Sequence, residues 1–189
     1  MIAITLPDGS VKQFESETTP MGVAISISEG FARNVISASF NGKTIETSTP
    51  ITKDGELVLY TWRDKKGKEA FWHSTAHILA QAMEGLYPGI KLTIGPAIEN
   101  GFYYDIDLAD NTISEKDLPT IENKMLEIAR GKHTFSVRES SKIAAIDYYK
   151  KQDNQYKVEL IENLEDGTIT FCDHDNFTDL CRGGHIPHT

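Results

Sequence analysis

Two turn signals in the first part of the chain constrain what it can fold into. Large hydrophobic residues alternate with small or polar ones over 2–6, Pro7-Asp8-Gly9 supplies a turn, and 11–14 reads as a returning strand. Asn41-Gly42 lies at the centre of a second hairpin pattern over 37–45. The first part of the chain is therefore predicted to contain two β-hairpins.

A short helix and a closing strand complete this pattern. Thr19 is a typical helix-capping residue and Pro20 suits the first helical position, so we predict a helix from there to Ile27. Residues 57–60 read as a further strand. The order β-β-α-β-β-β indicates a ubiquitin-like β-grasp domain over residues 1–62. This segment has no histidine or cysteine, so we expect a binding or scaffolding role for it.

A second domain, of the α+β class, is predicted over residues 69–189, after a lysine-rich linker at 63–68. Its first element is a helix over 69–86, because apolar residues recur there at helical spacing. The further expected strands lie at 91–97, 102–108, 133–138 and 168–172. A helix is expected from Ser114 or Asp117 to Arg130, another over 141–151, and a short element over 156–164.

Composition limits the classes of protein to consider. The hydrophobic fraction of 39% supports a folded globular chain, and no run approaches the roughly 20 apolar residues that a membrane span requires. No secretory signal is visible at the start, so we expect a cytoplasmic protein without a membrane partner. The net charge of -9 opposes strong independent binding to a nucleic acid.

Two pairs of imidazole or thiol side chains give the main indication of function. His73 and His77 form one pair, and Cys181 and His185 form the other, with the same spacing. Residues four apart on a helix lie on one face, so each pair can direct two reactive atoms at a common point. Zinc binding, general-base hydrolysis and attack by a thiol all use such a set.

The other histidines and the second cysteine show no comparable pairing. His133, His174 and His188 are interpreted as surface or strand residues, and Cys172 as a small buried apolar residue. A second site at Cys172-Asp173-His174 is a weaker hypothesis.

Four ordered motifs carry a resemblance to a known family. They are His73-Ser-Thr-Ala-His77, the run from Ile94 to Asp105, Tyr156-Lys157-Val158, and the run from Thr178 to His185. With these motifs the chain resembles, along essentially its whole length, the amino-terminal half of bacterial threonyl-tRNA synthetases. The resemblance implies a β-grasp module called TGS, followed by an α+β editing domain of the threonyl/alanyl-tRNA synthetase type.

The editing reaction of this family has a physical reason. Serine lacks one methyl group of threonine, and a methyl group gives only about 1–3 kcal/mol of discrimination, so a second, hydrolytic site is needed. The resemblance therefore implies hydrolysis of serine wrongly esterified to threonine tRNA, with the threonyl ester spared. The implied partners are the aminoacylated 3′ end of that tRNA and the remaining domains of a homodimeric full-length synthetase.

The resemblance also implies roles for individual residues. His73 is the implied general base, and His77 and His185 would position water or substrate. Lys157 would orient water or stabilise an oxyanion, and Asp179 would bind the substrate ammonium or the serine hydroxyl. Cys181 would line the pocket, and Gly183 and Gly184 would let the backbone approach the substrate closely and offer N–H donors to the oxyanion. Gly95, Pro96 and Tyr104 would contact the adenosine or the acyl group.

Alternatives to this chemistry stay open. One alternative is a zinc ion bound by His73, His77, Cys181 and His185. Because the Lys157 ammonium would repel zinc, we expect no required metal or other cofactor. A thiol nucleophile at Cys181, assisted by His185 and Asp179, is another. The rival classes of protein are a zinc-dependent trans-editing deacylase of the alanyl type and a noncatalytic tRNA-associated module.

The end of the chain adds one expectation. The sequence stops at Thr189, shortly after His185, whereas members of the family continue. We therefore expect an editing domain without its last elements, weak tRNA binding and a monomeric chain. Ligation of threonine to tRNA with ATP is expected only in full-length synthetases.

Overall fold

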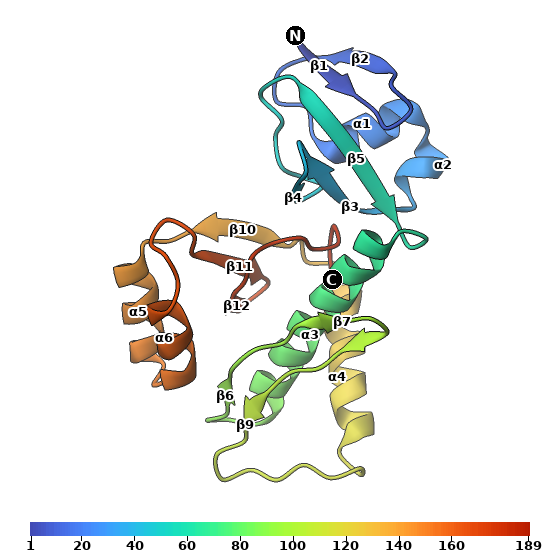
Figure 1. The fold of residues 1–189 in the computed structure, drawn as a ribbon. Coiled ribbons are helices and arrows are strands. Elements are labelled where there is room, and N and C mark those ends of the chain that lie inside the picture. Colours follow the sequence, from blue (N-terminus) through green and yellow to red (C-terminus); the bar gives the residue numbers. More distant parts are fainter. The chain divides into compact units, whose positions relative to one another are not determined.

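The computed structural model describes residues 1–189, which divide into two compact units. The first unit comprises Met1–Phe71 and Gly183–Pro187, and the second comprises Trp72–Arg182 and His188–Thr189. Figure 1 shows their elements, coloured along the chain. The segment Gly183–Pro187 thus belongs to the first unit by its contacts, although it lies near the end of the sequence.

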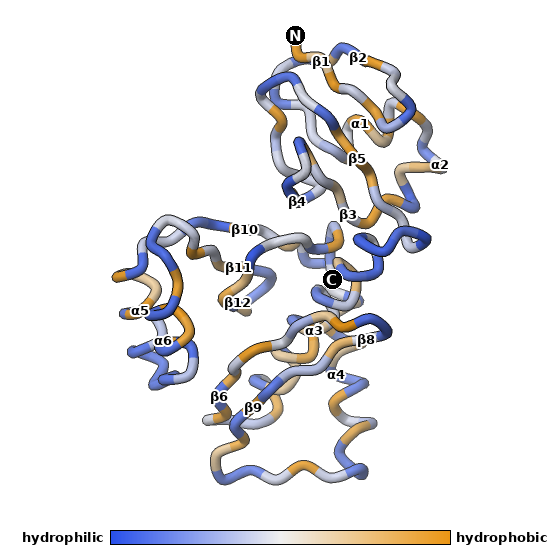
Figure 2. Tube along the Cα trace, in the orientation of Figure 1, coloured by the Kyte–Doolittle hydropathy of each residue, from blue (hydrophilic) through white to orange (hydrophobic).

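Five strands form one sheet in the first unit. They are β1 (Ile2–Thr5), β2 (Val11–Phe14), β3 (Val35–Phe40), β4 (Lys43–Ile45) and β5 (Gly55–Thr61). The sheet order is β2-β1-β5-β3-β4, with β1 and β5 parallel and the other neighbours antiparallel. Hydrophobic residues of β5 form an orange stretch in Figure 2. Both predicted hairpins are confirmed.

Helix α1 (Pro20–Ile27) packs on this sheet and begins where the sequence predicts. The Thr19 side chain accepts a hydrogen bond from the Gly22 N–H at 3.0 Å and so caps the helix. Val23 is fully buried in the core of the sheet, with Leu57 of β5. A five-stranded mixed sheet of this order, with a helix packed on it, is the ubiquitin-like β-grasp fold, as predicted.

A second, shorter helix, α2 (Glu29–Ala32), lies outside the predicted pattern. Its cap is Ser28, whose side chain accepts the Phe31 N–H at 3.0 Å. Four residues carry too little hydrophobic periodicity to be recognised from sequence, so this helix becomes visible only in the folded unit.

Helix α3 (Lys65–Leu86) begins before Glu69, so the segment predicted as a linker is largely helical. The Asp64 carbonyl accepts the Lys68 N–H at 3.0 Å and thereby starts the first turn. A Cβ atom at Gly67 would overlap the Thr61 carbonyl, so a glycine lets the helix start directly after β5. The charged residues before Glu69 lack the apolar periodicity from which the helix was predicted, so the sequence did not indicate this earlier start.

Four short strands form two antiparallel ladders in the second unit. β6 (Lys91–Leu92) pairs with β9 (Ile106–Asp107), and β7 (Ala97–Ile98) pairs with β8 (Gly101–Phe102). The sequence predicts two continuous strands here. In the structure they pair antiparallel, and the pairing is interrupted around Pro96, which has no N–H to donate to a ladder.

Helix α4 (Leu118–Gly131) packs against α3. Its Ile121 shares a core cluster with Ala80 and Met83 of α3. Gly131, which we expected just beyond the helix, is its last residue, and Lys132 closes the helix in the left-handed conformation with φ 51°.

A three-stranded sheet and two helices complete the second unit. The strands are β10 (Ser136–Glu139), β11 (Thr170–His174) and β12 (Phe177–Leu180), paired in that order, and the helices are α5 (Lys142–Lys151) and α6 (Gln155–Glu162). Tyr149, Ile161 and Phe171 pack the helices onto the sheet. β12 is absent from the predicted pattern, and it carries Asp179.

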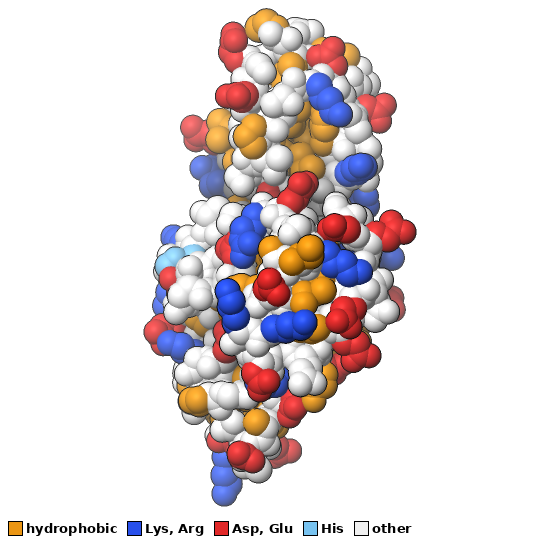
Figure 3. Space-filling model, turned by 90° about the vertical axis from the view of Figure 1, so that its left-hand side faces the viewer, with side chains coloured by type: hydrophobic (Ala, Val, Ile, Leu, Met, Phe, Trp, Pro, Cys, Tyr) orange, Lys and Arg blue, Asp and Glu red, His pale blue; other side chains and the backbone are white.

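The surface agrees with the composition. Acidic and basic side chains are interspersed over the face in Figure 3, and the net charge of the chain is -9. None of the helices combines the length and the apolar character needed to cross a bilayer.

Candidate functional site

Helix α3 presents His73 and His77 one turn apart on the same face. Their ring centroids lie 4.7 Å apart. His77 is only 3% exposed and neighbours the fully buried Ala76 and Ala80, whereas His73 is half-buried. The spacing of the pair therefore places both imidazoles at the edge of the buried face of the helix.

Strand β12 brings Asp179 and Cys181 to these histidines. Side chains two residues apart in an extended chain point to the same side. His73 Nε2 lies 2.9 Å from Cys181 Sγ, and His77 Nδ1 lies 3.1 Å from Asp179 Oδ2. His73, His77 and Cys181 each offer one metal-ligand type of atom, and these atoms lie within 4.8 Å of one another. Three of the four predicted ligand-type residues thus meet inside the second unit.

The buried Asp179 carboxylate also holds two further polar side chains. Lys157 Nζ donates to Oδ1 at 2.6 Å, and the Tyr104 hydroxyl donates to Oδ2 at 2.5 Å. The Leu180 N–H donates to Oδ1 at 2.8 Å. The side chains of Lys157 and Asp179 are each 3% exposed. Lys157 is therefore an internal cation, a property that its sequence neighbours do not reveal.

Local structure fixes Lys157 and Tyr104 in these positions. The Asn154 side chain caps α6 by accepting the Lys157 N–H at 3.1 Å, and it donates to the Leu92 carbonyl at 2.9 Å. A Cβ atom at Gly95 would overlap the ring of Tyr104. The absence of a side chain at Gly95 therefore allows the tyrosine to lie where its hydroxyl reaches Asp179.

The electrostatics of the cluster favour charged forms of its acid and its histidine. Burial alone would raise the pKa of Asp179, but the Lys157 ammonium and His77 outweigh burial and hold that pKa well below its usual range. Burial alone would lower the pKa of His77, but Cys181 and Asp179 raise it above its ordinary value. Burial and Asp179 raise the pKa of Tyr104, which is therefore a neutral donor near pH 7.

The last motif residues, Gly183, Gly184 and His185, belong to the first unit. His185 is completely buried, and its Nδ1 lies 3.0 Å from Oε1 of Glu46. The sequence pattern did not single out Glu46, because nothing distinguishes it from the other acids of residues 1–62. The convergence of His185 on the three residues of the second unit stays a prediction.

The unpaired histidines and Cys172 occupy other places. Cys172 is fully buried in β11, as predicted. His174 lies in the same strand and is also buried, and its Nε2 lies 3.1 Å from Oε1 of Gln81. His133 is half-exposed, with its Nε2 3.8 Å from Asp175 Oδ1. His188 Nδ1 lies 2.9 Å from the Thr189 carbonyl oxygen.

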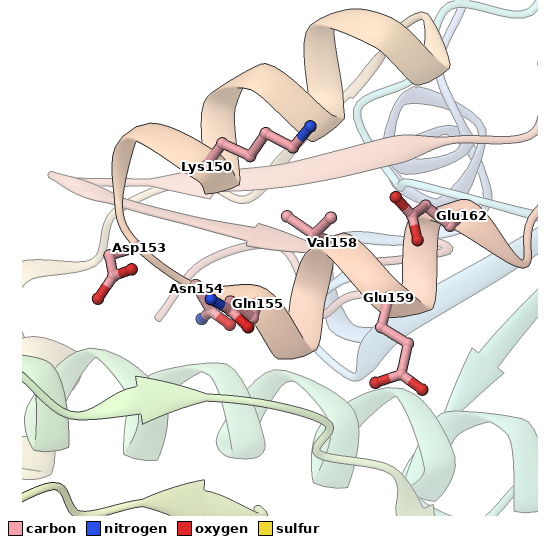
Figure 4. Close-up of a pocket in the computed structure, with 7 residues that line it drawn as sticks. All are labelled: Lys150, Asp153, Asn154, Gln155, Val158, Glu159 and Glu162. Atoms are coloured by element: carbon pink, nitrogen blue, oxygen red, sulfur yellow. The ribbon is translucent and has the colours of Figure 1, made fainter.

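A pocket on α5 and α6 is separate from these residues. Figure 4 shows its side chains; the lining residues are Lys150, Asp153, Asn154, Gln155, Val158, Glu159 and Glu162. It contains none of the predicted site residues. Three of its lining residues are acidic and one is basic, which disfavours a polyanionic ligand there.

Comparison with known proteins assigns the class of the first unit. The family model described as the TGS domain matches residues 2–61, which form the β-grasp sheet and its helices. Residues 2–61 are thus a TGS domain, and the second unit carries a cluster of histidine, cysteine, aspartate and lysine side chains.

Relatives over the full length extend this assignment. The chain is 68% identical over 189 residues to a threonine–tRNA ligase of Flavobacterium johnsoniae, 65% identical to that of Flavobacterium psychrophilum and 52% identical to that of Cytophaga hutchinsonii. Each comparison covers 100% of this chain and 29% of the relative. The chain is homologous to the amino-terminal region of threonine–tRNA ligases, as its motifs indicated.

Proposed function

We propose that this chain hydrolyses serine wrongly esterified to threonine tRNA and spares the threonyl ester. The observation that supports this most is the buried Asp179 carboxylate, which holds Lys157, Tyr104 and His77 together beside His73. A proton acceptor, a cation and a hydroxyl donor are groups that assist attack of water on an ester. The similarity to threonine–tRNA ligases supports the substrate class.

The selectivity follows from the size of one methyl group. A synthetic site that binds threonine also accepts serine, because losing a methyl contact costs only about 1–3 kcal/mol. A hydrolytic pocket that excludes the extra methyl group discriminates in the opposite sense. The synthetic site and the hydrolytic site in series therefore give more accuracy than either site alone.

His73 is the proposed general base. It is half-buried, so water can reach it, whereas His77 is 3% exposed and its charged form is favoured by Asp179 and Cys181. The attacking water must reach the base, and the buried His77 is less accessible to water than His73. His77 is therefore assigned to positioning water or substrate.

Lys157 is assigned to stabilising the negative charge that develops during hydrolysis. Tyr104 is assigned to contacting the acyl group or the adenosine. The resemblance to threonyl-tRNA synthetases implies that Asp179 binds the substrate ammonium or the serine hydroxyl. Both of its oxygens already contact protein groups, namely Lys157, the Leu180 N–H, Tyr104 and His77. We therefore assign Asp179 to orienting Lys157 and His77.

The other motif residues complete the proposal. Cys181 lines the pocket next to His73. His185 positions water or substrate, and Gly183 and Gly184 allow a close approach of the backbone. Gly95 and Pro96 flank Tyr104 at the acyl or adenosine end.

We propose that no metal is required. His73, His77 and Cys181 fit a zinc ion in atom type and spacing, and zinc would supply a more acidic bound water. In this alternative, His185 would be the fourth ligand. The ammonium of Lys157, paired with the same carboxylate that contacts His77, opposes a second cation nearby.

Hydrolysis of two charged tRNAs tests this function. Seryl-tRNA and threonyl-tRNA are incubated with the chain, with and without a chelator, and the loss of each ester is followed. We expect loss of the seryl ester alone, unaffected by the chelator. His73→Ala should reduce the rate by about 10²–10⁴-fold while the melting temperature is retained. His133→Ala, a half-exposed histidine outside the cluster, is the matched control.

Other outcomes of these experiments would support one of the alternative mechanisms or functions. Stoichiometric zinc and loss of activity with chelator would support the metal site. A trapped acyl-thioester, with complete loss on Cys181→Ala, would support the thiol mechanism. Hydrolysis of alanyl esters on mismatched tRNA would indicate a trans-editing deacylase. A chain without hydrolysis that unfolds on His73→Ala would be a noncatalytic module.

A longer protein is the proposed context of this region. The chain spans 29% of its threonine–tRNA ligase relatives. We propose that ligation of threonine to tRNA with ATP resides in further domains, in a cytoplasmic homodimer, and that the 3′ end of the charged tRNA is the partner of the region described by the structure.

A further inference from the structure

The Glu46 carboxylate contacts three nitrogen atoms from the other end of the chain. Glu46 follows β4, and its side chain is 10% exposed. Its carboxylate accepts the Gly184 N–H at 2.9 Å and the His185 N–H at 3.1 Å. His185 Nδ1 lies 3.0 Å from the same carboxylate. All of these residues belong to the first unit.

The backbone of the glycine pair is shaped for this contact. Gly183 and Gly184 have φ angles of 82° and 89°, in the left-handed region that favours glycine. Successive N–H groups in such a turn converge on one acceptor and form an anion-binding concavity. A Cβ atom at Gly184 would also lie 3.0 Å from Cγ2 of Thr44. The segment is therefore fitted closely around the Glu46 carboxylate.

The contact to Nδ1 determines what His185 can do. In a neutral imidazole one nitrogen carries the proton and the other carries a lone pair. The hydrogen-bond partner of one nitrogen sets which of the two is protonated. A carboxylate accepts hydrogen bonds, so Glu46 favours the proton on Nδ1 and the lone pair on Nε2. His185 is completely buried, so its ring is held in this orientation.

We propose that Glu46 is a positioning residue for the hydrolysis, because it holds His185 in the tautomer that presents Nε2 as an acceptor. This inference rests on the proposed function, in which His185 orients water or substrate. The TGS domain then contributes one side chain to the reaction in addition to any binding role.

The test uses the whole chain with nitrogen-15 in its histidines. The variants are Glu46→Gln, which keeps the size of the side chain, Glu46→Asp, which keeps its charge, and Glu56→Gln as a control on an exposed acid of the same sheet. His185→Asn identifies the His185 signals. The readouts are the nitrogen shifts of His185, kcat and KM for seryl-tRNA, and the melting temperature.

We expect the wild-type His185 to carry its proton on Nδ1 at neutral pH. Glu46→Gln should shift the tautomer signals and lower kcat by about 10–100-fold with KM little changed, the usual effect of removing a partner that orients a functional histidine. Glu46→Asp should recover part of the rate. In a His185→Asn background, Glu46→Gln should cause no further loss, because it acts through His185.

Three results would overturn the inference. They are a wild-type His185 that is protonated on Nε2 or on both nitrogens, unchanged tautomer signals in Glu46→Gln, and a rate loss no greater than that of Glu56→Gln. If Glu46→Gln does not fold, the wild-type spectrum and Glu46→Asp still decide. A wild-type chain without hydrolysis would refute the proposed function, while the tautomer signals would test Glu46 independently.

Discussion

At the scale of single residues, Asp179 and His77 make the stability of the second unit depend on pH in opposite senses. The pKa of Asp179 is lowered in the fold by Lys157 and His77, against the effect of burial. Its contribution to the free energy of unfolding is therefore present above the unfolded-state pKa of about 3.9 and is lost as pH falls through the lower folded-state pKa. The pKa of His77 is raised, with burial opposed by Cys181 and Asp179. Its contribution is complete below an unfolded-state pKa of about 6.5 and is lost as pH rises through the folded-state pKa. Urea denaturation between about pH 3 and 9 should show stability decreasing at the alkaline side, and this decrease should be missing in His77→Gln.

Asp179→Asn should reduce the free energy of unfolding by about 3–5 kcal/mol near neutral pH, because it leaves Lys157 buried without a counter-charge. Asp147→Asn, an exposed acid of α5, is the control and should have little effect. Equal stability of Asp179→Asn and Asp147→Asn would contradict the account of this ion pair.

At the scale of elements, the start of α6 controls where Lys157 lies. Asn154 caps this helix through its side-chain oxygen and binds the Leu92 carbonyl of β6 through its side-chain nitrogen. Asn154→Ala removes both contacts and should cost about 0.5–2 kcal/mol of stability, measured by urea denaturation. It should also reduce hydrolysis of the seryl ester, because Lys157 follows in the first turn of the helix. Asn154→Asp keeps the cap but cannot donate to Leu92, so it separates the two contacts. If Asn154→Ala loses stability but hydrolyses the ester at the wild-type rate, the placement of Lys157 does not depend on this cap.

At the scale of the whole molecule, charge limits the affinity of this chain for the tRNA partner that we propose. The chain has 28 acidic and 19 basic residues, and both signs are interspersed over the face in Figure 3. Affinity for a polyanion comes largely from released counterions, which requires clustered lysine and arginine. We expect a dissociation constant for threonine tRNA at physiological salt no tighter than about 10⁻⁶ M, within the range of non-specific binding. A fluorescence titration at several salt concentrations measures this, and a tight complex insensitive to salt would contradict it.

Much of the fold follows from local patterns in the sequence. The hairpin turns, the Thr19 cap of α1 and the helical stripe of α3 each depend on residues near one another in the chain, so the sequence alone predicted them. The elements it did not predict, α2 and β12, are only four residues long and carry too little periodicity. The early start of α3 was hidden by a run of charged residues.

The candidate site, too, is determined partly by local sequence and partly by tertiary structure. The spacing of His73 and His77 determined that both imidazoles share a helix face, because that spacing is a property of any helix. Only the tertiary structure buried Lys157 beside Asp179 and brought Tyr104 to the same carboxylate, since these residues come from separate segments. It likewise paired His185 with Glu46, across most of the length of the chain. No local pattern encodes such pairs, because each depends on where the packing of the core places the backbone.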